Sequence, residues 1–348
     1  MPVRMYKYGF PFVLYLLTLT SFFSTGFPVF IPLLYSWFLI PLLELVLKPD
    51  NSNLSAAEED LARQDTTYDY FLYAIVPLQY AALLCYLYQV AFVPQPLLDI
   101  IGKTLVMGLM CGTLGINVGH ELGHRVNKGE QFLAKALLLT SLYLHFFIEH
   151  NKGHHKRVAT PEDPSTARYG ESVYRFYFRS IVFSYISAWH IAAREARKRG
   201  FKAFSIHNEM LQYQLLQIVF VVAIGIVFSW TTALWFLAAA LNGILLLETV
   251  NYIEHYGLQR KAIAAGKWER AQPQHSWNSN HVIGRVMLFE LSRHSDHHYL
   301  ASRKYQVLRH HDHSPQMPTG YPGMMLLALL PPAWFYVMHK RIQQLQMQ

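Results

Sequence analysis

Histidine is the residue type whose distribution in this chain points most directly to chemistry. The first 119 residues contain none, and all 18 histidines lie from His120 onward. Half of them fall in four short segments. These nine are His120, His124, His150, His154, His155, His255, His294, His297 and His298. Imidazole binds iron, copper, zinc and nickel, so this many imidazoles in so few segments indicate more than one metal ion.

The spacing within the segments favours shared faces. Side chains three and four positions apart lie on the same side of a helix. His120 and His124 are four apart, His150 and His154 are four apart, and His294 is followed at three and four positions by two more histidines. Each helical segment would therefore project at least two imidazoles in one direction. Nine rings are enough for two ions with four or five ligands each.

An acidic residue lies beside a proposed ligand in every segment: Glu121, Glu149, Glu254 and Asp296. Metal-bound histidines usually donate their other ring N–H to a carboxylate or carbonyl. We therefore expect these acids to orient the imidazoles, the alternative being a solvated position at the surface. The other histidines are expected to be structural, solvated or behind the ligands, namely His145, His190, His207, His275, His281, His310, His311, His313 and His339.

The composition predicts a membrane protein. Of the 348 residues, 52% are hydrophobic and only 15% are charged, against about 25% charged in soluble domains. Apolar runs long enough to cross a bilayer predict six spans in three hairpins, at 8–24, 27–47, 70–92, 98–119, 213–230 and 232–250. The expected fold is all-α and polytopic, a single membrane-embedded domain over 1–348, with a helical cap from 120–212 and 251–348 that carries the histidines.

Lysine and arginine in the short loops set the expected orientation. Arg4 and Lys7 precede the first span, and the short turns after the first and third spans carry no charge. The histidine segments lie among Arg125, Lys128, Lys152, Lys156 and Arg157. This bias places the N-terminus and every histidine segment in the cytoplasm, and it accounts for the net charge of +8 without nucleic acid. The apolar segments 132–148 and 174–189 are expected to fold back or lie along the interface.

Two further sequence features narrow the possibilities. The first apolar run is followed at once by a second, so we expect no cleavable leader. Cys85 and Cys111 lie inside predicted spans, where cysteine packs as a small apolar residue. Because there is no C-x-x-C pair, we expect neither a thiolate zinc site nor a fused rubredoxin-type iron centre in this chain.

Two rival functions use the same residues. The segment His120-Glu121-Leu122-Gly123-His124 matches the H-E-x-x-H of zinc peptidases, but a peptidase site would leave six of the nine histidines unused. A metal transporter would place ionisable residues inside its spans, whereas the histidines lie at span ends. What remains is a dinuclear site at the edge of an apolar bundle. Iron is preferred because a dioxygen reaction needs a redox-active metal; the histidines alone leave the metal open.

The motifs HELGHR (120–125), EHNKGHHKRVATPEDPSTARYGES (149–172), NYIEHYGLQR (251–260) and LSRHSDHH (291–298) resemble those of the integral-membrane alkane monooxygenases, within the desaturase and hydroxylase superfamily. The resemblance runs from about residue 10 to residue 338 and includes HSWNSN (275–280). Membrane desaturases share the general spacing and xylene monooxygenases are nearer relatives, but the last two motifs favour the alkane group. Ser292 departs from the glutamine common in that family and lies beside the ligands.

The resemblance implies a non-haem centre of two iron ions, with the nine histidines as ligands. It implies hydroxylation of the terminal methyl of medium- to long-chain n-alkanes to 1-alkanols with dioxygen, in the bacterial cytoplasmic membrane. Rubredoxin and rubredoxin reductase would supply two electrons. A related hydroxylase or desaturase acting on xylene methyl groups or fatty acyl chains is the alternative reading.

Two side-chain roles follow if the substrate enters from lipid and electrons come from outside. Trp37, midway along the second span, is a candidate for the far wall of an apolar substrate channel; packing or lipid contact is the alternative. The basic residues Arg125, Lys128, Lys152, Lys156 and Arg157 would steer an acidic redox protein to the site, although the positive-inside bias accounts for part of this charge.

Overall fold

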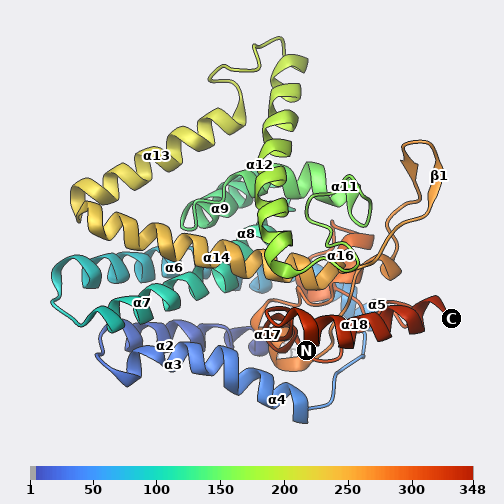
Figure 1. The fold of residues 1–348 in the computed structure, drawn as a ribbon, viewed down its shortest axis with the longest axis horizontal. Coiled ribbons are helices and arrows are strands. Elements are labelled where there is room, and N and C mark those ends of the chain that lie inside the picture. Colours follow the sequence, from blue (N-terminus) through green and yellow to red (C-terminus); the bar gives the residue numbers. More distant parts are fainter. Residues whose placement is uncertain (1–4, 348) are drawn as a thin grey trace. The chain divides into compact units, whose positions relative to one another are not determined.

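The computed structural model describes residues 5–347 and is built mainly from helices (Figure 1). Within that range, the strands form one short antiparallel pair, β1 (Ala262–Ala264) and β2 (Lys267–Trp268). The chain divides into two compact units. The first contains the residues up to Tyr35 together with Thr67–Gly153 and Tyr185–Leu247, and the second contains Ser36–Thr66, His154–Ser184 and Glu248–Gln348. The single domain expected over 1–348 stays a prediction.

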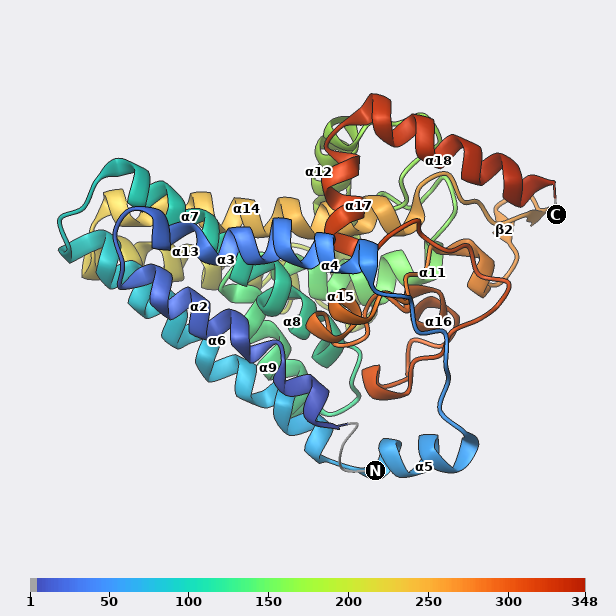
Figure 2. The ribbon, with the colours of Figure 1, turned by 90° about the horizontal axis from the view of Figure 1, so that it is seen from below.

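The first unit contains most of the long apolar helices. Its helical segments are η1 (Tyr6–Gly9), α2 (Phe12–Phe22), η2 (Phe27–Phe30), α3 (Ile31–Leu34), α6 (Thr67–Phe92), α7 (Leu97–Met110), η4 (Cys111–Ile116), α8 (Asn117–Gly123), α9 (Lys128–Leu139), α10 (His145–Glu149) and α13 (Glu209–Val227). Figure 2 shows α2 alongside α6, and α6 also packs against α7. The C-terminal part of α12 (Val173–Lys198) and most of α14 (Trp230–His255) belong to this unit too.

The second unit consists of shorter elements and loops. Its helical segments are α4 (Ile40–Val46), α5 (Ala56–Gln64), α11 (His155–Arg157), η6 (Pro273–His275), α15 (Val282–Met287), α16 (His294–Tyr299), η7 (Tyr305–Val307), α17 (Tyr321–Ala328) and α18 (Pro331–Gln346). The π-helical turns η3 (Tyr35–Leu39) and η5 (His150–His154) lie where the chain passes between units. Glu44 joins three elements of this unit, since it accepts a 2.8 Å hydrogen bond from the Gly284 amide and its other oxygen contacts Gly320.

Five helices among residues 5–347 are long and apolar enough to cross a membrane. They are Phe27–Val46, Thr67–Phe92, Leu97–Gly123, Glu209–Val227 and Trp230–His255. Each corresponds to a predicted span. The break expected near residues 229–232 is at Phe228 and Ser229, and the Ser229 hydroxyl accepts the amide of Thr232 at 3.0 Å. Serine at such a position begins a helix because it satisfies a free N–H.

The expected first span, 8–24, has no counterpart of that length. Its α-helix contains 11 residues, Phe12–Phe22, which is about 16 Å at 1.5 Å per residue and short of a ~30 Å hydrocarbon core. Pro11 occupies the N-cap position, and the preceding turn is 3-10 helical. Proline lacks the N–H that would continue an α-helix from the N-terminal side. Five candidate spans are therefore found, and the sixth stays a prediction.

Glycines allow close packing of the helix that carries the first histidines. A Cβ at Gly112 would lie 3.0 Å from the Gly243 carbonyl oxygen, and one at Gly243 would meet Cys111 and the Gly108 backbone. Small residues at such positions let membrane helices approach closely. The helix continues from Leu97 to Gly123. His120 therefore lies inside this helix, whereas the sequence pattern predicted it in a separate cap. His255 is likewise the last residue of α14.

Candidate metal centre

Three of the nine histidines form a group in the first unit. His120 and His124 extend from the end of α8, and their Nε2 atoms are 3.0 Å apart. The His150 ring lies 4.4 Å from that of His120 and 5.1 Å from that of His124, centroid to centroid. Phe146 stacks on His150 at 4.6 Å. We call His120, His124 and His150 the trio.

Four histidines form a buried group in the second unit. His154, His255, His294 and His298 can each offer one ring nitrogen, and these atoms all lie within 4.8 Å of one another. The Nε2 atoms of His255 and His294 are 3.2 Å apart. Each of the four side chains is at most 6% exposed. We call these residues the quartet.

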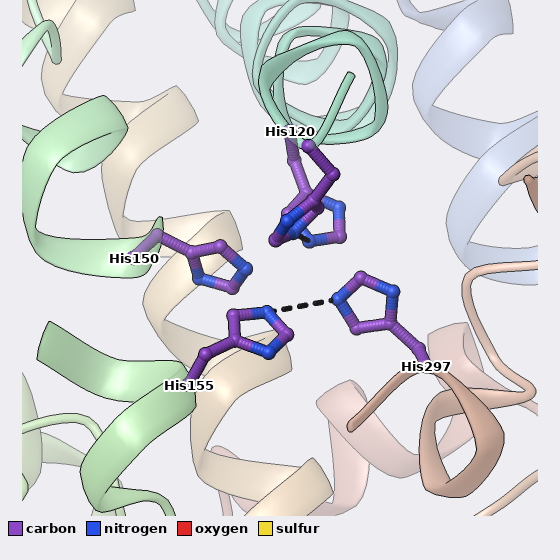
Figure 3. A group of neighbouring side chains, drawn as sticks. His120, His150, His155 and His297 are labelled. Carbon is purple, nitrogen blue, oxygen red and sulfur yellow. Dashed lines mark hydrogen bonds between the residues drawn. The ribbon is translucent and has the colours of Figure 1, made fainter. Parts of the chain in front are cut away.

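The remaining two histidines, also in the second unit, face each other. The Nε2 atoms of His155 and His297 are 3.1 Å apart, joined by the dashed line in Figure 3. His155 also stacks on His298 of the quartet, with ring centroids 4.4 Å apart. We call His155 and His297 the pair.

The nitrogen separations fit metal ligation. Two nitrogens that bind one ion at about 2.1 Å and about 90° to each other lie about 3.0 Å apart. One pair of Nε2 atoms in each of the trio, the pair and the quartet is separated by 3.0, 3.1 and 3.2 Å, respectively. Both ring nitrogens of His298 are buried without a hydrogen-bond partner among residues 5–347. A buried polar atom needs a partner, and a metal ion would supply one.

Burial also keeps His297 and His298 in the neutral form that metals bind. Burial lowers the pKa of His297 to about 3 and that of His298 well below its usual value. Neighbouring histidines lower the pKa of His298 further. Metal ions bind the neutral imidazole, so these residues are ready to ligate at neutral pH. The donor set therefore fits a first-row transition metal such as iron.

The four predicted carboxylates have different surroundings. Glu254 lies 3.1 Å from Nδ1 of His294 and accepts a 2.7 Å hydrogen bond from the Tyr321 hydroxyl, as expected of an orienting acid. Asp296 is different, since its oxygens contact Arg303 at 2.8 Å and His311 at 2.7 Å. Asp296 also lies near enough to His297 to raise the pKa of that imidazole against the stronger lowering by burial, and its role in orienting a metal-bound histidine stays a prediction.

The other two acids lie on the helices of the trio. Glu121 forms a 2.8 Å ion pair with Arg125. The carboxylate of Glu149 packs against Gly153, where any Cβ would collide with it. Gly153 lies within the π-helical turn η5, which positions His150 and His154. A larger residue at position 153 would therefore force the Glu149 carboxylate to move.

Asp163 orients a histidine of the quartet and was missed by sequence reasoning. Its Oδ2 lies 2.8 Å from Nδ1 of His154 and accepts a 2.6 Å hydrogen bond from the Thr166 hydroxyl. Burial alone would raise the pKa of this carboxyl, but His154 and Thr166 lower it. The acid lies nine residues from its histidine, beyond the adjacent positions that we considered. Its place in the long motif 149–172 was the available signal.

The histidines expected to be structural are absent from the trio, quartet and pair. His145 is buried between Tyr143 and Tyr185. His339 contacts the Tyr256 hydroxyl at 2.9 Å, and His281 contacts the Ser279 hydroxyl at 3.0 Å. His311 contacts Asp296 of α16 at 2.7 Å. This contact fits the prediction that His311 lies behind the proposed ligands, the alternative being a solvated position.

The predicted donor-docking residues are only partly available. The predicted docking role of Arg125 is wrong. Its side chain is 9% exposed and forms ion pairs with Glu121 and Asp69, so it cannot serve as a surface charge. Lys128, Lys152 and Lys156 are exposed, but Lys152 forms a 2.7 Å ion pair with Glu195. Arg157 is half-buried. Trp37 is half-buried in the π-helical turn η3 of the second span.

Comparisons with known proteins agree with these features. The fatty acid desaturase family model matches residues 94–328. Alkane 1-monooxygenase 1 of Alcanivorax borkumensis is 40% identical over 314 residues, which are 90% of this chain and 77% of that protein. Alkane 1-monooxygenase 1 of Pseudomonas aeruginosa is 45% identical over 254 residues, covering 73% of this chain and 66% of that protein.

A more distant relative tests the alternative reading. The hydroxylase component of the xylene/toluene monooxygenase of Pseudomonas putida is 28% identical over 246 residues, which are 70% of this chain and 64% of that protein. The identity to the alkane enzymes is higher and, for the Alcanivorax protein, extends further along the chain. The family match, the identity along most of the chain and the histidine geometry lead to one assignment: this protein belongs to the fatty acid desaturase family and, within it, to the alkane 1-monooxygenases.

Proposed function

We propose that this protein hydroxylates the terminal methyl group of medium- to long-chain n-alkanes, using dioxygen and a centre of two iron ions. The observation that carries the proposal is the gathering of the nine histidines into trio, quartet and pair, with nitrogen separations suited to ligation. The relatives named as alkane 1-monooxygenases support the substrate class.

We propose that the quartet binds one of the two irons. Its four side chains can each offer one ring nitrogen, and these atoms all lie within 4.8 Å of one another. All four side chains are buried, and both ring nitrogens of His298 lack a hydrogen-bond partner among residues 5–347. A metal ion would supply a partner for one of these nitrogens.

In this proposal the irons supply the dioxygen chemistry, and the protein positions and shields the reacting groups. Asp163 and Glu254 hold the rings of His154 and His294 through their Nδ1 atoms, which leaves Nε2 of each ring for a metal. Burial of the quartet excludes bulk water. An alkane has no polar group to orient it, so selectivity for the chain end requires a narrow apolar channel, and we place Trp37 on its wall.

Each turnover of a monooxygenase requires two electrons, which this chain has no cofactor motif to store. We propose rubredoxin, reduced by its reductase, as the donor, and place the enzyme in the bacterial cytoplasmic membrane with its metal centre facing the cytoplasm. The exposed charge of Lys156, with its neighbour Arg157, supports a docking contact for an acidic carrier. Alkanes partition into lipid, which suits a multi-pass enzyme with five candidate spans.

Metal and product analysis tests the proposal. The purified enzyme should contain two irons per chain and convert octane or hexadecane to the 1-alkanol more readily than it oxidises xylene. His298→Gln should remove about one iron, whereas the control His281→Gln, a histidine outside the nine, should keep both. One zinc per chain and turnover without dioxygen would instead favour the peptidase. Preference for xylene or a fatty acyl chain would favour the related hydroxylases and desaturases.

A further inference from the structure

A polar cavity lies within the first unit. It has a volume of about 720 Å³ and is lined by residues of α9, the C-terminal end of α12 and the beginning of α13. Its lining includes Lys128 and Lys135 from α9, Lys198 from α12 and Glu209 from α13. Sites that enclose small ligands have volumes of about 300–1,000 Å³.

The charges of this cavity are unbalanced in favour of an anion. Five basic side chains line it, against two carboxylates. Both carboxylates are already paired, Glu209 with Lys135 at 3.1 Å and Glu195 with Lys152 at 2.7 Å. Three cationic side chains therefore remain in excess, and they are Lys128, Lys198 and Arg199. Such a surplus of positive charge on a concave surface attracts an anionic ligand.

The cavity lies at the polar end of a candidate membrane span. Glu209 and Gln212 line it and belong to the first turn of α13, whose residues Glu209–Val227 form that span. Leu216 and Val219 follow Gln212 at helical spacing, on the same side of α13. Both are exposed, at 47% and 62%. A row of apolar side chains thus leads from the cavity along the helix toward the membrane interior.

Aromatic residues beside the cavity also suit the membrane interface. Phe132 lines the cavity and is 70% exposed, and Phe204, in the loop before α13, is 76% exposed and stacks on Trp189. Tryptophan and tyrosine rings and long cationic side chains concentrate at the level of lipid headgroups, and Trp189 is such a ring. A phospholipid needs a polar site for its headgroup, excess positive charge for its phosphate and an adjoining apolar surface for an acyl chain. The cavity and its surroundings have all three features.

We propose that this cavity binds the headgroup of an anionic phospholipid, with an acyl chain lying along Leu216 and Val219 of α13. Lys128, Lys198 and Arg199 would contact the phosphate, because they are the lining cations left over from the two ion pairs. The occupant is a lipid and not an acidic protein, because a folded carrier presents a broad convex surface that does not enter a cavity of this size. The proposal does not depend on the metals or on turnover.

Lipid retention by the purified, metal-loaded enzyme tests the proposal. The protein is exchanged into detergent with phosphatidylglycerol or phosphatidylcholine, and bound lipid is measured by native mass spectrometry across a concentration series. The wild type should retain phosphatidylglycerol in preference to phosphatidylcholine. Lys128→Gln combined with Lys198→Gln should weaken phosphatidylglycerol binding about thirtyfold, since each cation near a membrane surface contributes about 1 kcal/mol.

Arg197→Gln combined with Lys202→Gln is the matched control. It removes the same charge from neighbouring exposed positions that do not line the cavity, and it should bind lipid like the wild type. Equal loss in the two double variants, or no preference for the anionic lipid, overturns the proposal. A cavity variant that keeps lipid binding but loses affinity for an acidic redox protein would also overturn it and assign the surface to a protein partner.

Discussion

The carboxylate of Asp163 lies 2.8 Å from Nδ1 of His154, although a loop of eight residues separates them in the chain. This contact fixes which ring nitrogen of His154 is left for a metal, and Thr166 holds the carboxylate in place. Partners of this kind are as much a part of a metal site as the ligands.

Asp163→Asn should weaken metal binding about 10- to 100-fold, the effect usual for loss of an acid behind a ligand histidine. The asparagine retains the shape but removes the negative charge that the surroundings of this carboxyl favour. Metal affinity is measured by competition with a chelator. Asp312→Asn, at a fully exposed side chain, is the control, and equal affinity of the two variants would contradict an orienting role.

Trp37→Ser should lengthen the longest alkane that the enzyme accepts, because removal of the ring would extend an apolar channel. Product yields across a series of n-alkanes measure this. Trp230→Ser replaces a tryptophan that is 61% exposed at the start of another span, and it should leave the profile unchanged. An unchanged profile in the Trp37 variant would place that residue outside the channel.

Lys156→Glu should raise the KM for reduced rubredoxin severalfold and leave kcat nearly unchanged, since a surface charge mainly affects encounter with the partner. The difference from the wild type should shrink as salt is added, because exposed charges are screened. Lys267→Glu, an exposed residue on β2, is the comparison. A KM that does not respond to the change at residue 156 excludes this contact.

His145 should make the folded state less stable in mild acid. Burial lowers its pKa to about 4 from an ordinary value of 6.5, so below 6.5 the unfolded chain takes up a proton that the folded chain does not. This costs stability as the pH falls from about 6.5 to 4, up to about 3 kcal/mol.

Thermal unfolding of the metal-free protein, followed from pH 7 to pH 5, measures the effect. His145→Phe should show a flatter pH dependence than the wild type, because it lacks the buried imidazole that resists protonation in the folded state. His190→Phe replaces a histidine of α12 and serves as the control. Parallel curves for the wild type and His145→Phe would assign the acid sensitivity to other groups.

Five of the six predicted spans and the short histidine segments could be recognised from the sequence, because both depend on residues that are close together in the chain. Hydrophobic length and helical spacing are local properties, so they can be read from neighbouring residues. The five candidate spans and the break at Ser229 follow from them. The α-helix within the first predicted span begins only after Pro11, a boundary that a count of apolar residues does not register, so this span stays a prediction.

The features that sequence reasoning missed depend on contacts between distant residues. Arg125 looked like a surface charge, but Asp69, far away in the chain, lies 3.3 Å from its guanidinium and helps to bury it. Asp163 reaches His154 across a loop. The π-helical turn η5 has no composition signal of its own, yet it sets the directions of His150 and His154.

Two adjacent histidines, His154 and His155, contribute to different groups, the quartet and the pair, and His298 and His297 are divided in the same way. The peptide bond holds neighbouring α-carbons about 3.8 Å apart. The covalent link between adjacent histidines therefore limits the distance between the ions that the two groups would bind. Loops elsewhere can lengthen during evolution without altering that spacing, whereas one residue inserted within either dipeptide would destroy it.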